Sequence, residues 1–132
     1  MNIIKAKTFT GEATFGLKRG YKEELISIEE FKMQLIAAQQ RVYKEMDLKL
    51  SAKVSLCSIV FSGQDEPSVD LSFIQYPKFP IKESSLKKGI LRLVELLMKE
   101  LDQNRVVVVF DDETIMKEVN GDLLDPAINF SN

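Results

Sequence analysis

The stretch that decides the fold is Arg105-Val106-Val107-Val108-Val109-Phe110, which is followed at once by the acidic residues Asp111-Asp112-Glu113. Four consecutive valines and a phenylalanine predict a short β-strand, because β-branched and aromatic residues favour extended backbone. Polar residues do not alternate with the apolar ones in this run. We therefore expect this strand to be covered on both faces and the other elements to pack around it.

The composition is that of one soluble globular domain, with 132 residues, 45% hydrophobic and 29% charged. A formal charge of −2 and a pI near 5.3 argue against a general binder of nucleic acid or acidic membranes. Cys57 is the single cysteine, which excludes an intrachain disulfide and fits a reducing compartment. The start has no signal-peptide pattern, and no apolar run approaches the ~18 residues of a membrane span. We expect a cytoplasmic protein with no membrane segment.

Histidine is absent from the chain, and this absence limits the possible chemistry. Ser-His-Asp and Cys-His catalytic arrangements are excluded within one chain, as is a tetrahedral zinc site of the usual kind. Any catalysis must therefore depend on carboxylate, lysine, arginine or tyrosine side chains. No sequence motif indicates a cofactor, and we expect none.

Alternation of apolar and polar residues predicts strands ahead of the valine run. Residues 12–18 alternate regularly, and so do residues 69–76, while residues 50–61 alternate and then end in a fully apolar segment. The seven residues 62–68 have the composition of a loop. Such a short connection predicts that the strands on either side of it form an antiparallel hairpin.

Two longer helices are predicted from apolar residues at helical spacing. The first covers residues 27–46 and starts with a capping box, in which Ser27 is the N-cap and Glu30 reaches back to it. The second covers residues 84–101 and is capped by one of the two serines at its start. Leu96 falls outside the apolar face of this second helix.

The order of these elements, with a further short helix over residues 113–119, predicts an α+β fold. The simplest architecture is a ferredoxin-like βαββαβ two-layer sandwich, with a four-stranded sheet and both helices on one face. Residues 1–119 are expected to form a single domain and residues 120–132 a C-terminal tail. In the usual strand order, 4-1-3-2, the last strand lies at an edge, where an apolar strand needs a cover. We expect a neighbouring subunit to cover it, in a dimer or trimer, with the N-terminal segment and the tail as alternatives.

Asp111, Asp112 and Glu113 form the densest acidic cluster in the chain. They follow a predicted strand at its carboxyl end, where α/β proteins often place binding groups. Three carboxylates are candidate ligands for a hard cation such as Mg²⁺ or Ca²⁺. The preferred interpretation is that they cap the short helix, because acidic residues favour the positive end of a helix dipole.

A basic segment around Gly20 is a candidate site for a phosphate or carboxylate group. Its side chains are Lys18, Arg19, Tyr21 and Lys22, but the segment matches no nucleotide-binding motif. A solvated loop is the preferred interpretation. Cys57 lies in a predicted strand between apolar neighbours, which indicates a buried and inert thiol.

Several features favour self-association. The candidate interface residues are Val106, Val108 and Phe110 of the last strand, together with Leu96 and Tyr43 of the helices. Charge is also unevenly placed, because basic residues gather in segment 78–92 and acidic residues in segment 111–125. Opposite patches of this kind permit self-association or electrostatic attraction of a partner.

The segment Ser72-Phe73-Ile74-Gln75-Tyr76 resembles the aromatic core of the third-strand signature of the RNA-recognition motif, a family with the same βαββαβ order. The resemblance implies that nucleic-acid bases stack on Phe73 and on Phe15 or Tyr76 from the open sheet face. The chain departs from the signature where its basic-Gly-aromatic start is replaced by Val69-Asp70-Leu71.

Three functional hypotheses follow from these observations. The first is a non-catalytic, oligomeric domain with an interaction or small-ligand-binding regulatory role. The second is a carboxylate-based enzyme, with or without a divalent metal, centred on Asp111 to Glu113. The third is an RNA-recognition-motif-like protein, which the acidic composition disfavours.

Overall fold

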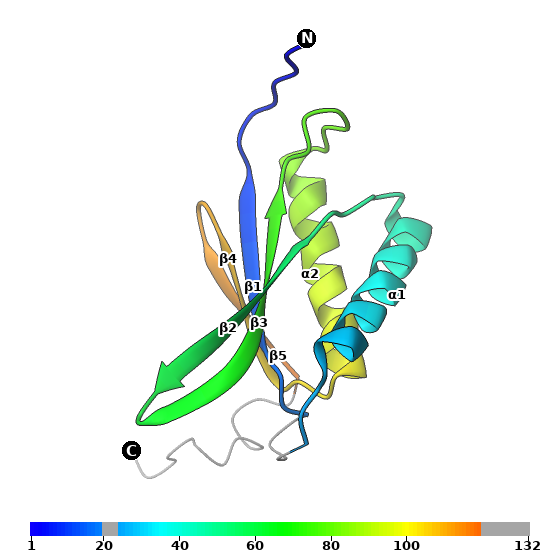
Figure 1. Ribbon diagram of the computed structural model, residues 1–132. Helices are drawn as coiled ribbons and strands as arrows, with labels where there is room; N and C mark the ends of the chain where they lie inside the picture. Colours follow the sequence, from blue (N-terminus) through cyan, green and yellow to red (C-terminus); the bar gives the residue numbers. More distant parts are fainter. Residues whose placement is uncertain (20–23, 120–132) are drawn as a thin grey trace.

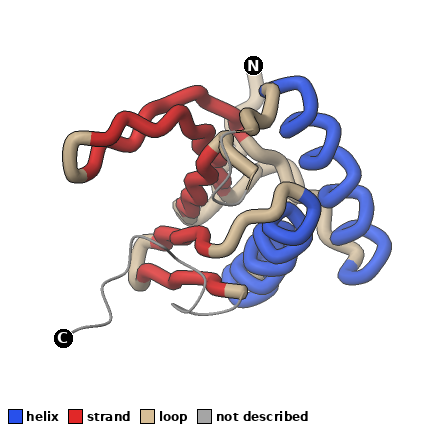
Figure 2. Tube along the Cα trace, turned by 90° about the horizontal axis from the view of Figure 1, so that it is seen from below, coloured by secondary structure: helices blue, strands red, loops and turns tan. Residues whose placement is uncertain are grey.

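Five strands and two helices make up the fold in the computed structural model, which describes residues 1–19 and 24–119. Figure 1 shows both helices on one side of a twisted sheet, and Figure 2 shows the same two layers from below. The predicted tail, residues 120–132, lies outside the described residues. The elements are β1 (Thr10–Gly16), α1 (Ile28–Met46), β2 (Lys53–Phe61), β3 (Gln64–Ile74), α2 (Glu83–Glu100), β4 (Arg105–Phe110) and β5 (Thr114–Glu118).

The sheet has the order β2-β3-β1-β4-β5, and every neighbouring pair is antiparallel. The predicted four-stranded ferredoxin-like sandwich is therefore wrong, and so is the short helix over residues 113–119. The chain reverses directly after β4, where the Phe110 N–H donates to the Glu113 carbonyl at 2.8 Å. This turn pairs the β-branched Thr114 and Ile115 with β4 as a fifth strand.

The valine run is buried on one face only. Val106, Val108 and Phe110 point into the core, whereas Val107 and Val109 are 43% and 46% exposed on the opposite face. The expectation that both faces are covered is wrong. β4 is also not an edge strand, because it lies between β1 and β5. A neighbouring subunit is therefore not needed to cover an edge at β4.

The β2–β3 hairpin is longer than predicted, because residues 62–68 do not form a loop. Ser62 and Gly63 have φ values of 50° and 76°, the left-handed backbone that a tight two-residue hairpin turn requires. β3 starts at Gln64, and Pro67 pairs opposite Ser58 within the ladder. The outer half of the hairpin extends beyond the helices (Figure 1), so polar residues are tolerated there on both faces.

The predicted N-cap of α1 is confirmed, since the Ser27 hydroxyl accepts from the Glu30 N–H at 3.1 Å. The Glu30 carboxylate binds the Arg19 guanidinium at 2.5 Å. α2 starts at Glu83, and its N-cap is Lys82 rather than either predicted serine. Leu96 is buried, contrary to its predicted place outside the apolar face, because α2 packs against α1 as well as the sheet.

Aromatic and aliphatic side chains fill the space between the helices and the sheet. Phe15 and Phe31 meet edge to face with ring centroids 5.5 Å apart, and Phe73 is buried beside them in the same core. The RNA-recognition-motif interpretation is wrong on this point, because Phe15 and Phe73 face the helices and not the open face of the sheet. Neither of the described helices is long and apolar enough to cross a membrane.

Candidate functional site

The face of the sheet that points away from the helices carries a polar centre. Ala13 and Phe15 of β1 are fully buried under the helices, so Glu12 and Thr14 point to the opposite side. In the β1–β3 register Glu12 lies opposite Ser72 and Thr14 lies opposite Asp70. We call this side the open face, since no helix among the described residues covers it (Figure 2).

Asp70 is held in place by hydroxyl groups of the two central strands. Its carboxylate accepts from the Thr14 hydroxyl at 2.7 Å and from the Ser72 hydroxyl at 3.4 Å. Glu12 lies diagonally across from Asp70, a separation that long side chains bridge. We call Glu12 and Asp70 the carboxylate pair.

Asp70 changes the protonation of Glu12. A side-chain hydrogen bond with Asp70, the negative charge of that residue and partial burial together raise the pKa of Glu12 above its usual range. A proton on Glu12 is therefore retained to higher pH than on an isolated glutamate. A carboxyl group whose pKa is raised in this way is a candidate for acid–base chemistry.

Polar groups of β2 border the carboxylate pair on one side. Lys53 lies opposite Ser72, and Ser55 lies opposite Asp70, so both side chains reach the open face. Cys57 is also exposed, and the prediction that it is buried is wrong. Desolvation and then the charges of Asp70 and Glu12 raise the pKa of the Cys57 thiol, which stays protonated at neutral pH.

Apolar side chains border the carboxylate pair on the other side. Val107, Val109 and Met116 are 43%, 46% and 54% exposed on β4 and β5. Val109 lies directly opposite Glu12 in the β1–β4 register. The open face therefore combines two carboxylates, a lysine, hydroxyls and an apolar band, which suits a ligand that has charged and apolar parts.

The predicted metal ligands form the turn between β4 and β5. Asp111 accepts hydrogen bonds from the hydroxyl and backbone N–H of Thr10, and Lys87 binds Asp112 and Glu113 at 2.6 and 3.3 Å. The hydrogen bond from Lys87 lowers the pKa of Asp112. The preferred helix-capping interpretation is wrong because no helix follows. Among the described residues, no group of three or more acidic, Cys or His side chains is arranged to hold a metal ion.

The basic residues around Gly20 are not assembled as a ligand site in the part that the structure describes. Arg19 binds Glu30, contacts Glu24 at 3.8 Å and donates to the Glu100 carbonyl at 3.2 Å, so it joins the start of α1 to the end of α2. Lys18 forms a β-bridge with Leu25. Tyr21 and Lys22 lie outside the described residues.

Most of the predicted interface residues lie inside the chain. Val106, Val108, Phe110 and Leu96 are buried, whereas Tyr43 is 46% exposed on α1. Sequence reasoning also missed the carboxylate pair. Its signal was the alternation that places Glu12 and Thr14 on one face of β1 and Asp70 and Ser72 on one face of β3.

Comparison with known proteins gives structural matches but no sequence family. No family model matches the chain, and no curated protein matches it. One solved structure, a phage SAM lyase in complex with S-methyl-5′-thioadenosine, is 19% identical with a TM-score of 0.67, over 90% of this chain and 95% of that one. A phage SAM lyase in the apo state is 18% identical with a TM-score of 0.71, over 85% of this chain and 90% of that one. At these identities the likeness establishes a shared fold.

Proposed function

We propose that the chain is an enzyme that cleaves S-adenosylmethionine or a closely related sulfonium nucleoside on the open face of its sheet. The observation that carries the proposal is the carboxylate pair on the open face of a fold similar to that of phage SAM lyase. The proposal favours the enzyme hypothesis over the non-catalytic one. It places the acting carboxylates at Glu12 and Asp70 instead of Asp111 to Glu113.

The charges of the substrate match those of the open face. S-adenosylmethionine carries a sulfonium, an ammonium and a carboxylate. The carboxylate pair suits the cationic groups, and Lys53, two strands away from Glu12, suits the substrate carboxylate. Cleavage needs no cofactor, because a sulfonium is itself a good leaving group.

The reaction that fits these groups breaks the bond between sulfur and the γ-carbon of the amino-acid part. The electron pair passes to sulfur, which leaves as the neutral thioether S-methyl-5′-thioadenosine. In the same step, the substrate carboxylate attacks the γ-carbon and forms a lactone, or a protein carboxylate removes a β-proton and the C–H electron pair forms an alkene. Because sulfur loses its charge in the transition state, a carboxylate beside sulfur would stabilise the substrate more than the transition state. We therefore place the carboxylate pair at the amino-acid end, where it holds the ammonium or accepts the proton.

The test is direct incubation of the purified protein with S-adenosylmethionine. We expect S-methyl-5′-thioadenosine to accumulate with catalytic turnover, faster than in a protein-free control that measures spontaneous decay. Mass spectrometry of the four-carbon product separates lactone formation from elimination. Substrate loss at the spontaneous rate, over a range of pH and protein concentration, would contradict the proposal.

We further propose that the chain forms a homo-oligomer, now through the outer half of the β2–β3 hairpin rather than through β4. Leu56, Val60 and Phe61 are 66%, 72% and 76% exposed there. Leu56 and Val60 lie on one face of β2 and Phe61 lies on the other. Exposed apolar side chains gathered on one hairpin favour an interface there. The cytoplasmic location expected from the sequence stays a prediction.

Light scattering coupled to gel filtration tests self-association. We expect a mass of at least twice the 15.0 kDa of one chain, because pairing of two hairpins would bury these exposed apolar side chains. Replacing both Val60 and Phe61 by Ser is expected to lower that mass. The matched control is Ile36→Ala, which truncates a residue that is 54% exposed on α1. A wild-type mass near 15.0 kDa at all dilutions would rule out the oligomer.

A further inference from the structure

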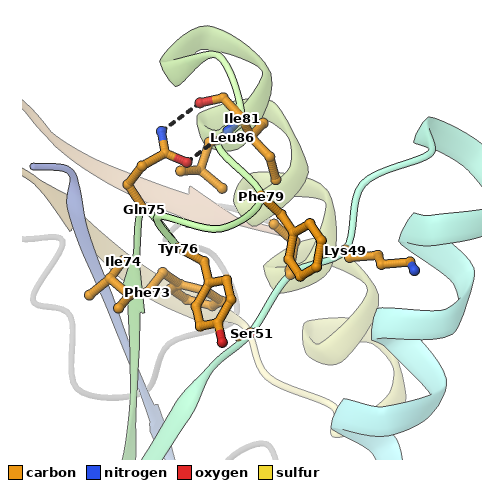
Figure 3. Close-up of a pocket in the computed structure, with 10 residues that line it drawn as sticks. Lys49, Ser51, Phe73, Ile74, Gln75, Tyr76, Phe79, Ile81 and Leu86 are labelled. Atoms are coloured by element: carbon orange, nitrogen blue, oxygen red, sulfur yellow. Dashed lines mark hydrogen bonds between the residues drawn. The ribbon is translucent and has the colours of Figure 1, made fainter. Parts of the chain in front are cut away.

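A cavity of about 300 Å³ lies at the end of the sheet near the carboxyl end of β3. It is enclosed by the segment 49–51, the last residues of β3 and the loop that leads to α2 (Figure 3). Its walls are mainly apolar, with Lys49 and Ser51 as polar groups on one side. The volume is at the lower end of the range for small-molecule sites, enough for a part of a substrate the size of S-adenosylmethionine.

Two stacked aromatic rings line this cavity and remain exposed to solvent. Tyr76 and Phe79 have ring centroids 5.9 Å apart and planes tilted by 15°, and they are 50% and 63% exposed. The Lys78 ammonium lies 5.9 Å from the Phe79 ring centroid. A base that stacks on that face of Phe79 would displace this flexible side chain. Stacking on such a face is the sequence-tolerant way in which proteins bind a nucleobase.

The loop that carries the rings is fixed before any ligand binds. The Gln75 side-chain amide donates to the Ile81 carbonyl at 2.5 Å and accepts from the Ile81 N–H at 2.7 Å (Figure 3). The Phe79 N–H donates to the Tyr76 carbonyl at 3.1 Å, and Pro77 and Pro80 restrict the backbone between these contacts. A loop held in this way loses little conformational entropy on binding, which favours affinity.

The cavity lies at the end of the sheet and borders both of its sides. The buried Phe73 and Leu86 line it from the helix side, and the exposed Ile74 lines it on the side of the open face. Ile74, which lines the cavity, follows Ser72 by two residues on β3, a step of about 7 Å. Ser72 lies directly opposite Glu12. Ser51 also lines the cavity, and Lys53, the first residue of β2, follows it by two residues. A molecule that leaves the cavity past Ile74 and runs along β3 on the open face therefore approaches Glu12 and Asp70.

We propose that this cavity is the nucleoside subsite of the enzyme, with the adenine stacked on the Phe79–Tyr76 pair and the 5′-sulfur directed along β3 toward the carboxylate pair. This inference rests on the proposed function, since it assigns the two ends of the same substrate. Charge fixes the direction, because the carboxylate pair attracts the cationic end of the substrate. The hydroxyl of Ser51 is placed to bond the ribose or the base.

The test measures binding of S-methyl-5′-thioadenosine, the neutral thioether, to the full chain by isothermal titration calorimetry. Phe79→Ala is expected to weaken binding at least tenfold, because the stacking face is lost. Phe79→Trp keeps a stacking face and is expected to bind within about threefold of wild type. Ile36→Ala, on the outer side of α1, is the control for truncation of an exposed apolar residue and should bind as wild type does.

Two outcomes separate the subsite from the proposed function, and a third contradicts both. Binding that depends on Phe79, together with no cleavage of S-adenosylmethionine, would support the subsite and overturn the lyase activity. Cleavage with thioadenosine binding unchanged in Phe79→Ala and in Tyr76→Ala would overturn the subsite and leave the activity standing. Absence of both binding and cleavage in the wild type would overturn both. The melting temperatures of the variants check that each one is folded, which is expected because both rings are exposed.

Discussion

Val108→Asp is expected to unfold the protein or to destabilise it by several kcal/mol, whereas Val107→Asp, one residue earlier, is expected to fold. Val108 is fully buried under the helices, so an aspartate there places an unpaired charge in the core. Folded domains are stable by only about 5–15 kcal/mol, so the loss is a large part of the total. Val107 is 43% exposed on the open face, where an aspartate remains hydrated.

Urea denaturation followed by circular dichroism measures both variants. The pair is a matched comparison, because residue type, strand and substitution are the same and only the side of the sheet differs. Equal losses of stability in the two variants would mean that both faces of β4 are covered, as the valine run alone suggests. A Val108→Asp variant that melts within a couple of degrees of wild type would contradict the described core.

The valine run illustrates what a sequence cannot decide. A strand whose two faces are both apolar has no internal sign of which face meets water, since the pattern depends on what the rest of the chain supplies. Here the helices cover Val108 on one face of β4. On the other face Val109 belongs to the exposed apolar band of the open face, together with Met116. β5 was missed for a related reason. Its polar residues Lys117 and Glu118 favour a helix by propensity. The turn before β5 reverses the chain and pairs these residues with β4 as a strand.

Local signals were interpreted more reliably than long-range ones. The N-cap at Ser27 depends on residues three positions apart, and the structure confirms it. The hairpin turn depends on the left-handed backbone at Ser62 and Gly63. The polar composition of residues 62–68 predicts a seven-residue loop instead of this two-residue turn. Leu96 lies outside the stripe of α2 that faces the sheet. The periodicity of α2 alone does not show that α1 also packs against this helix.

The carboxylate pair depends on strand register, which one sequence does not contain. Alternation correctly places Asp70 away from the core, but its partner Thr14 is 56 residues away in the chain. Only the β1–β3 pairing brings Glu12 next to Asp70. The adjacency of Asp111 to Glu113 in the sequence predicts a metal site, but Lys87 and Thr10 bind these carboxylates in the structure. Adjacency in the sequence therefore does not identify the carboxylates that share the open face.

Asp70→Asn is expected to lower the rate of S-adenosylmethionine cleavage at least a hundredfold, the lower range for loss of a positioned acid–base group. Asp70 is the better ordered member of the carboxylate pair, since Thr14 and Ser72 both donate to it. Asparagine keeps the size and one acceptor oxygen but removes the charge. Glu29→Gln, an exposed change on the first turn of α1, is the control and should leave the rate unchanged. A loss of less than threefold in a folded Asp70→Asn protein would exclude the carboxylate pair from the reaction.

The pH dependence of the remaining activity tests the coupling within the pair. Because Asp70 raises the pKa of Glu12, the cleavage rate of the wild type should rise with pH through a value above the usual 4.5 of a glutamate, as Glu12 becomes ionised. Asp70→Asn removes the carboxylate whose hydrogen bond and negative charge raise the pKa of Glu12, so the acid limb of the profile should move to lower pH. Glu12→Gln cannot ionise and should lose that limb altogether. A limb at the same pH in wild type, Asp70→Asn and Glu12→Gln would assign the titration to another group, and the carboxylate pair would then hold the substrate ammonium without taking a proton.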